Sequence, residues 1–71
     1  NNSRNLLTLI KESIIILSQL ADKLGEVIPI EEFEDALEKK DYKKKDISQT
    51  IESLKRHGMI FEPREGYLRL I

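Results

Sequence analysis

The apolar residues at the start of the chain recur at the spacing of an α-helix, which limits the chain to folds that begin with an amphipathic helix. From Leu6 to Leu24 they are three or four positions apart, so they share one face. The stripe is Leu6, Ile10, Ile14, Leu17, Ala21 and Leu24. Ser3 can cap this helix, and Gly25 can end it in a left-handed conformation. The pattern predicts a first helix over residues 4–24, about half of whose circumference needs a buried partner.

Ile15 does not fit this pattern, because it projects from the middle of the polar face of the first helix. One interpretation is a single exposed isoleucine, which needs no special explanation. The other is a contact with a neighbouring domain, since a chain that begins at Asn1 without Met is expected to be part of a longer protein. We favour the first interpretation and keep Ile15 as the candidate interdomain contact.

A short strand and a second helix are predicted next. Residues 26–28 contain two β-branched side chains and are followed by Pro29, which cannot donate a hydrogen bond within a sheet, so they predict a stub of strand. Residues 30–40 predict a helix with acids in its first turns and lysines at its end, the order that the helix dipole favours. Its inner stripe is Ile30, Phe33, Ala36 and Leu37. The outer face of this helix is strongly negative and would repel phosphates.

A turn and a third helix follow. Asp is one of the few residues that accept positive φ, so Asp41 can end the second helix while Tyr42 packs back onto its last turn. Residues 46–57 predict the third helix, with Asp46 and Gln49 forming a capping-box-like pair at its start. Its inner stripe is Ile47, Ile51 and Leu54.

The chain ends in two β-prone runs that follow Gly58 and are joined by Pro63-Arg64-Glu65-Gly66. A turn with Pro early and Gly late predicts a β-hairpin over residues 59–71. Three aromatic side chains are expected to close the core, namely Tyr42, Phe61 and Tyr67. The order helix, stub strand, helix, turn, helix, hairpin is that of a winged helix-turn-helix. We therefore expect an α+β, mainly helical fold of three helices, a short strand and a C-terminal hairpin wing.

Length and composition limit this fold to one small, non-catalytic domain. The 71 residues suffice for a single core, so residues 1–71 are expected to form one domain. With no Cys and a single His, the chain supplies neither a zinc site nor a disulfide framework, and its three glycines are too far apart for a phosphate-binding loop. His57 precedes a helix end, where it is expected to act as a cap. We expect no catalytic, cofactor-binding or metal-binding residues.

Charge and hydropathy restrict the partners. Twelve Lys+Arg and thirteen Asp+Glu give a formal net charge of -1, which argues against a protein that coats DNA without preference. The longest uninterrupted apolar run, residues 14–17, is far shorter than the roughly 20 residues that span a bilayer. We expect an intracellular, cytoplasmic protein associated with the nucleoid, and no membrane partner.

The residues that can contact nucleic acid or a partner protein lie on the third helix, in the turn before it and on the wing. They are Lys43, Lys44, Lys45, Ser48, Gln49, Arg56 and Arg64. Phosphates would repel Glu52, which the helical period places between Gln49 and Arg56 beside Ser53, so specific base readout is not expected. The lysines form either a solvated turn that balances the acidic helix or a weak, salt-sensitive phosphate contact.

Two motifs in residues 51–71 carry a family resemblance, Leu54-Lys55-Arg56-His57-Gly58 and Glu62-Pro63-Arg64-Glu65-Gly66-Tyr67. Each is followed by a short apolar run. This ending resembles that of the archaeal minichromosome-maintenance (MCM) replicative helicases, whose chains finish with Leu-Lys-Arg-x-Gly, an apolar strand, Glu-Pro-Arg-x-Gly-Tyr and a last apolar strand. Residues 26–50 agree more loosely, and residues 1–25 agree only as an amphipathic helix.

The resemblance implies the C-terminal accessory winged-helix domain of a ring-shaped AAA+ helicase. Such a domain is tethered to the helicase core, modulates ATPase and unwinding activity, and contacts replication factors or DNA; the parent would be a hexamer and the isolated domain a monomer. No catalytic residue of the family maps onto this chain. The acidic second helix and Glu52 depart from a DNA-reading winged helix, which favours a protein contact over direct duplex binding. The alternative is a stand-alone winged-helix DNA-binding transcriptional regulator.

Overall fold

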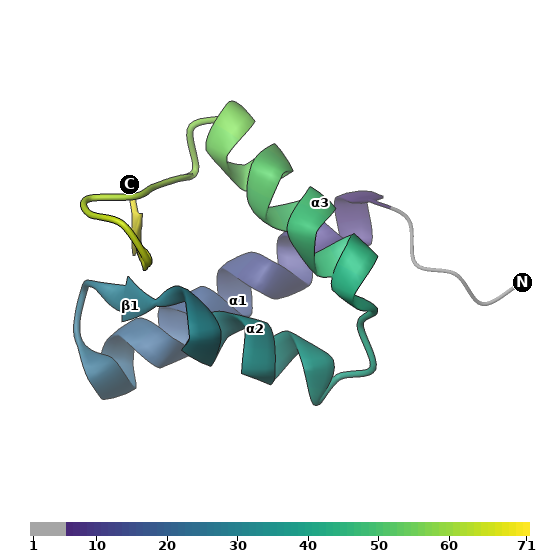
Figure 1. The fold of residues 1–71 in the computed structure, drawn as a ribbon, viewed down its shortest axis with the longest axis horizontal. Helices are drawn as coiled ribbons and strands as arrows, with labels where there is room; N and C mark the ends of the chain where they lie inside the picture. The colour runs from purple at the N-terminus through teal and green to yellow at the C-terminus, as the bar shows by residue number, and fades with distance from the viewer. Residues whose placement is uncertain (1–5) are drawn as a thin grey trace, which may run out of the picture.

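Three helices and a three-stranded antiparallel sheet make up residues 6–71, the part of the chain that the computed structural model describes (Figure 1). The prediction of a mainly helical α+β fold is confirmed. The elements are α1 (Leu6–Leu24), β1 (Ile28–Pro29), α2 (Ile30–Glu38), α3 (Lys44–Arg56), β2 (Ile60–Phe61) and β3 (Tyr67–Leu70). The cap predicted at Ser3 lies outside the described residues.

The buried face of α1 is rotated from the predicted stripe. Its centre is formed by Leu9, Ser13, Ile16 and Leu17, all buried. Of the predicted stripe, Leu17 is fully buried, Ile10, Ile14 and Ala21 are partly buried at the edge of the core, and Leu24 is 48% exposed. The pattern misplaced this face because its middle position is a serine rather than an apolar residue. Gly25 ends the helix as predicted, with φ at 108° and its N–H donating to the Ala21 carbonyl at 2.9 Å.

The turn after α2 has the predicted form, although α2 ends at Glu38 rather than at residue 40. Asp41 adopts a φ of 68°, and the Tyr42 N–H donates to the Leu37 carbonyl at 3.2 Å. Tyr42 is buried, and its hydroxyl donates to the Glu12 carboxylate on α1. The turn therefore ties the end of α2 to α1.

The start of α3 corrects a prediction, because the helix begins at Lys44 and Asp46 is not its cap. Lys43 occupies the N-cap position with an extended backbone and no side-chain cap bond, and its carbonyl accepts the Ile47 N–H at 2.9 Å. Lysine is a good helix former, so two of the three turn lysines join the helix. Asp46 lies in the first turn, where a carboxylate still suits the helix dipole. The predicted inner stripe is confirmed, since Ile47, Ile51 and Leu54 are all buried.

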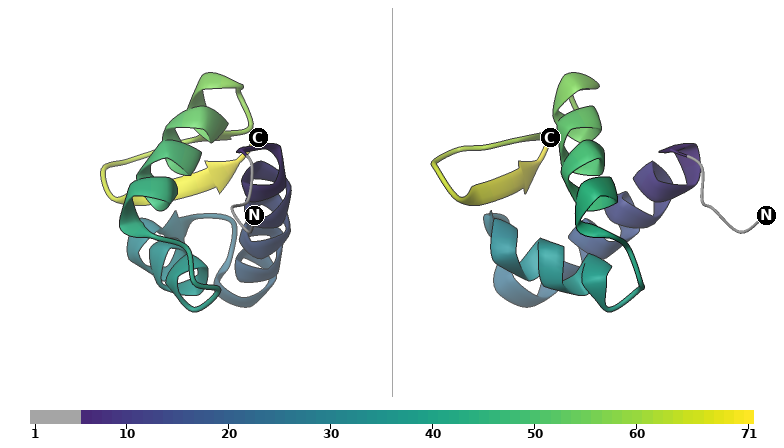
Figure 2. Two further views of the ribbon diagram at one scale, coloured as in Figure 1. Left: turned by 90° about the vertical axis from the view of Figure 1, so that its right-hand side faces the viewer. Right: turned by 45° about the vertical axis from the view of Figure 1, so that its right-hand side comes forward.

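The sheet has the strand order β1-β3-β2, with β3 in the centre. β1 pairs with β3 through Ile28 and Leu68 and through Pro29 and Tyr67, so the strand predicted over residues 26–28 includes Pro29 and excludes residues 26 and 27. Pro29 is accommodated because β1 is an edge strand. Figure 2 shows the hairpin standing out to one side of the helices.

One aromatic residue of the hairpin departs from its predicted position. Ile60, which precedes Phe61 on β2, is buried, and successive side chains of a strand point to opposite faces. Phe61 therefore faces away from the core and is 42% exposed, which makes the prediction that it closes the core wrong. Tyr67 is half-buried.

Candidate nucleic-acid and partner interface

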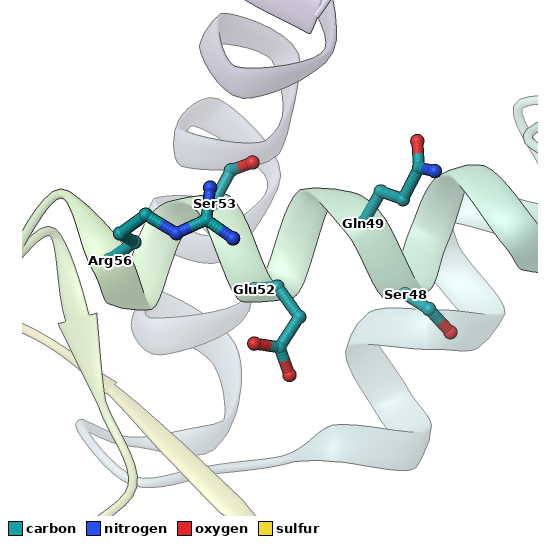
Figure 3. A pocket seen from close by; sticks show the side chains of 5 residues that line it. All are labelled: Ser48, Gln49, Glu52, Ser53 and Arg56. Carbon is teal, nitrogen blue, oxygen red and sulfur yellow. The ribbon is translucent and has the colours of Figure 1, made fainter.

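The outer face of α3 holds a shallow hollow of about 390 Å³. It is lined by Ser48, Gln49, Glu52, Ser53 and Arg56, all from this helix (Figure 3). Four of these side chains are exposed, as predicted, but Ser53 is only 4% exposed. The helical period placed Ser53 on the outer face, whereas the structure places it at the margin of the core. Ser48, Gln49 and Arg56 thus remain the accessible polar contacts of this face.

The two opposite charges on this face do not neutralise one another. Figure 3 shows the Arg56 side chain running back along the helix toward Ser53, whereas the Glu52 carboxylate points to the other side. Within residues 6–71, neither side chain takes part in an ion pair. A phosphate that approaches Arg56 therefore also meets the field of Glu52, which weakens the attraction.

The three lysines lie at the N-terminal end of α3. Lys43 is the N-cap residue, Lys44 and Lys45 are in the first turn, and all three are exposed. The positive end of the helix dipole adds to their charge, so this end of α3 attracts anions. Both roles foreseen for the lysines, a phosphate contact or a solvated charge balance, are compatible with these positions.

Acids of α2 lie close to this basic end. Glu34 and Glu38 line a hollow of about 200 Å³ together with Lys44, Ile47 and Ser48. The negative face of α2 therefore borders the lysines and reduces the attraction that a phosphate would experience. The charged side chains of α2 and α3 that line this hollow therefore have opposite signs.

The hairpin is joined to the end of α3 by one carboxylate. Glu62 accepts a hydrogen bond from the Lys55 ammonium at 2.9 Å and another from the Gly66 N–H at 3.1 Å. The hydrogen bond from Lys55, and after it that from Gly66, lowers the pKa of Glu62. Arg64 lies over the Tyr67 ring, 4.3 Å from its centroid, so its guanidinium is held along the hairpin by a cation–π contact.

His57 acts as the predicted cap. It is the C-cap residue of α3, and its backbone N–H donates to the Ser53 carbonyl at 3.0 Å. Its Nδ1 lies 2.8 Å from the same carbonyl oxygen. This distance fits a hydrogen bond donated by the imidazole. The contact gives His57 a role in ending the helix.

The predicted contact residues are distributed over one helix and the hairpin. Lys43 and Arg56 lie at opposite ends of α3, whose length is roughly 20 Å at 1.5 Å per residue. Arg64 is on the hairpin, which Glu62 links to the C-terminal half of α3. Ile15 is 57% exposed on α1 and lines none of the hollows described above. It is therefore separate from the other candidate residues.

Other classes of site are not evident in residues 6–71. No group of three or more His, Cys, Asp or Glu side chains in this region is arranged to hold a metal ion. None of its helices combines the length and apolar character that crossing a membrane requires. Comparisons with protein-family models, known proteins and solved structures give no match for this chain.

Proposed function

We propose that this chain is a C-terminal winged-helix accessory domain of an MCM-like replicative helicase, and that it acts through a protein contact and at most weak contact with DNA. The arrangement of α2, a tight turn and α3, followed by a hairpin that pairs with β1, supports the winged-helix assignment. The parent helicase would supply the ATPase, and this domain would modulate its rate.

The observation that carries the proposal is that the two motifs of the resemblance contact each other. Lys55 of the first motif pairs with Glu62, the first residue of the second, and Glu62 also accepts the Gly66 N–H. Arg64 and Tyr67 of the second motif stack on one another. These contacts give a physical reason for the two motifs to occur together at this spacing, and they support treating the two motifs as one structural unit.

The distribution of charge favours a protein over DNA as the main partner. Glu52 interrupts the polar face of α3, and the acids of α2 border its lysines. Each phosphate that approaches this side meets opposing charges within a short distance, so the net attraction is small. A protein partner can match both signs of charge, which makes this mixed surface better suited to protein recognition.

The experiment is a deletion in the full-length protein that carries this chain. Residues 1–71 are removed, and the rates of ATP hydrolysis and of unwinding of a forked DNA duplex are compared with those of the intact protein. We expect the deletion to change both rates while the hexamer persists by size-exclusion chromatography. Unchanged rates, or a full-length sequence without an ATPase upstream, would overturn the proposal.

A stand-alone DNA-binding regulator is the second candidate, favoured by the exposure of Ser48, Gln49 and Arg56 on α3. It predicts saturable shifts of these amide signals, and of the Arg64 amide, when duplex DNA is added at low salt. It also predicts a dimer, because regulators of this kind commonly bind paired half-sites. Absence of shifts at high protein concentration excludes this candidate.

A further inference from the structure

The sheet has an apolar outward face that the candidate contacts on α3 do not include. Large apolar side chains remain exposed in or next to its strands, at 37% for Val27, 38% for Met59, 42% for Phe61 and 77% for Ile71. They make up four of the seven large apolar residues that are exposed within residues 7–71. Clustering of this kind marks a binding surface more often than exposed apolar residues scattered singly do.

The strand register places these side chains on the same face. Phe61 pairs with Arg69, and the Ile71 N–H donates to the Met59 carbonyl at 3.1 Å, so β2 and β3 continue in register to the end of the chain. On the other side Ile28 pairs with Leu68, and Val27 lies just before β1, next to Glu26, whose carboxylate pairs with Arg69. Side chains alternate between the faces of a strand, which leaves Arg69 in the middle of this apolar face.

Arg69 gives the face a defined charge. Its side chain is 44% exposed, and within residues 6–71 it forms one ion pair, from Nη2 to the Glu26 carboxylate at 2.8 Å. The guanidinium carries five N–H donors, so this bond leaves capacity for a second carboxylate. Glu26 is 77% exposed at its side chain and does not cover the cation. Aromatic, methionine and arginine side chains are also those enriched at the centres of protein interfaces.

We propose that the outward face of the sheet, defined by Val27, Met59, Phe61, Arg69 and Ile71, docks an amphipathic helix of a partner protein that carries a carboxylate among its apolar side chains. Three strands about 4.8 Å apart span about 10 Å, which matches the width of one helix. A second copy of this chain fits less well, because a symmetric pairing of the two faces would bring Arg69 near Arg69 of the copy. The surface is independent of the helicase assignment.

The small size of the face implies a weak contact. Its five side chains bury much less than the roughly 800 Å² per partner of a standard stable interface. Such a contact becomes effective when the two parts are tethered or held in one assembly, where the local concentration is high. The docking helix is thus expected on a protein that already lies close to this domain.

The test uses the ¹⁵N-labelled chain and two synthetic amphipathic helical peptides of about 15 residues, or four turns. Both place Leu at i, i+3, i+4 and i+7; one has Glu next to this stripe and the other has Lys at the same positions. We expect the acidic peptide to shift the amides of Met59, Phe61, Arg69 and Ile71, with a Kd at least about tenfold lower than that of the basic peptide. Equal binding of both peptides, shifts confined to other elements, or no shifts at millimolar peptide would overturn the proposal.

Three variants make the test specific. Phe61→Ser removes the exposed aromatic side chain and Arg69→Glu reverses the central charge, so both variants are expected to bind the acidic peptide more weakly. Arg69→Glu should in addition bind the basic peptide more tightly. Leu7→Ser is the matched control, because Leu7 is 61% exposed on α1 and its change should leave binding intact. Each variant is first checked for a native-like amide spectrum, with Arg69→Gln replacing a misfolded Arg69→Glu. Shifts that depend on protein concentration without peptide would identify a second copy as the occupant and refute this proposal.

Discussion

The substitution Ser13→Ala should stabilise this domain, although it removes a polar group from a helix. Ser13 lies at the centre of the buried face of α1 and is 0% exposed. Its hydroxyl is the one buried side-chain polar atom within the described residues that has no hydrogen-bond partner. A buried hydroxyl without a partner has given up its hydrogen bonds to water and formed none in their place.

The magnitude follows from the burial and the helical position. Leaving a buried polar group without a partner costs about 1–3 kcal/mol, and alanine adds about 0.5 kcal/mol of helix propensity over serine. Removal of one oxygen atom leaves little new cavity, so the net gain is expected to be at least about 1 kcal/mol. For a domain of this size that gain raises the Tm by at least about 4 °C.

The assay is thermal unfolding followed by circular dichroism, with Thr50→Val as the matched control. Thr50 is also 0% exposed, but its hydroxyl donates to the Asp46 carbonyl at 2.7 Å. Removal of that satisfied bond should destabilise the domain by about 0.5–1.5 kcal/mol. The two deletions of a buried hydroxyl are thus expected to have opposite signs. A lower Tm for Ser13→Ala would show that the Ser13 hydroxyl has a partner and would contradict this prediction.

Three further predictions concern the hairpin and the basic end of α3. The pKa of Glu62 is lowered on folding, so its ionised carboxylate stabilises the fold fully at pH values above the ordinary pKa of a glutamate, and this stability is lost as the pH falls through the lowered pKa. Glu62→Gln should therefore make the Tm depend less on pH in the acid range. An unchanged dependence of Tm on pH would contradict this prediction. Gly58 has a φ of 71°, so Gly58→Ala should cost about 1 kcal/mol and Gly58→Asn clearly less, as measured by urea unfolding; equal costs would argue against backbone strain. If Lys43–Lys45 bind phosphates, replacing all three by alanine should make DNA binding less sensitive to salt. The slope of log K against log salt concentration should become shallower by about 0.9 for each phosphate that is no longer neutralised. An unchanged slope would identify the lysines as a solvated turn.

The sequence predicted most elements of the fold because their ends depend on local backbone chemistry. Gly25 and Asp41 adopt the positive φ values that the residue types suggested, and the Pro63–Gly66 turn joins two paired strands. The start of α3 was misplaced because a favourable cap residue, Asp46, competes with the helix propensity of the lysines before it. The earlier start lets the N–H of the buried Ile47 donate to the Lys43 carbonyl at 2.9 Å.

The positions of the surface residues were harder to predict, because burial depends on contacts between distant segments. Ser13 and Ser53 are polar yet buried, and Phe61 is aromatic yet exposed. Residue type gives the wrong side in each case, since the register of the sheet sets the position of Phe61 and the packing of the helices sets those of the two serines. The alternation of Ile60 and Phe61 on a two-residue strand is too short to be seen as a pattern.

The two types of surface differ in how strongly they can attract a partner. On the helices, charges of both signs line the same hollows, Glu52 with Arg56 on α3 and the acids of α2 with Lys44, and within residues 6–71 they form no ion pairs with each other. Each favourable contact with a phosphate is offset by a nearby repulsion, and salt screens what remains. On the sheet the apolar side chains gain free energy from burial whatever the salt concentration, and Arg69, although paired with Glu26, keeps N–H donors for a second carboxylate. Recognition at physiological salt is therefore expected to depend more on the sheet than on the helices, so that raising the salt concentration should weaken DNA binding far more than binding of the acidic peptide.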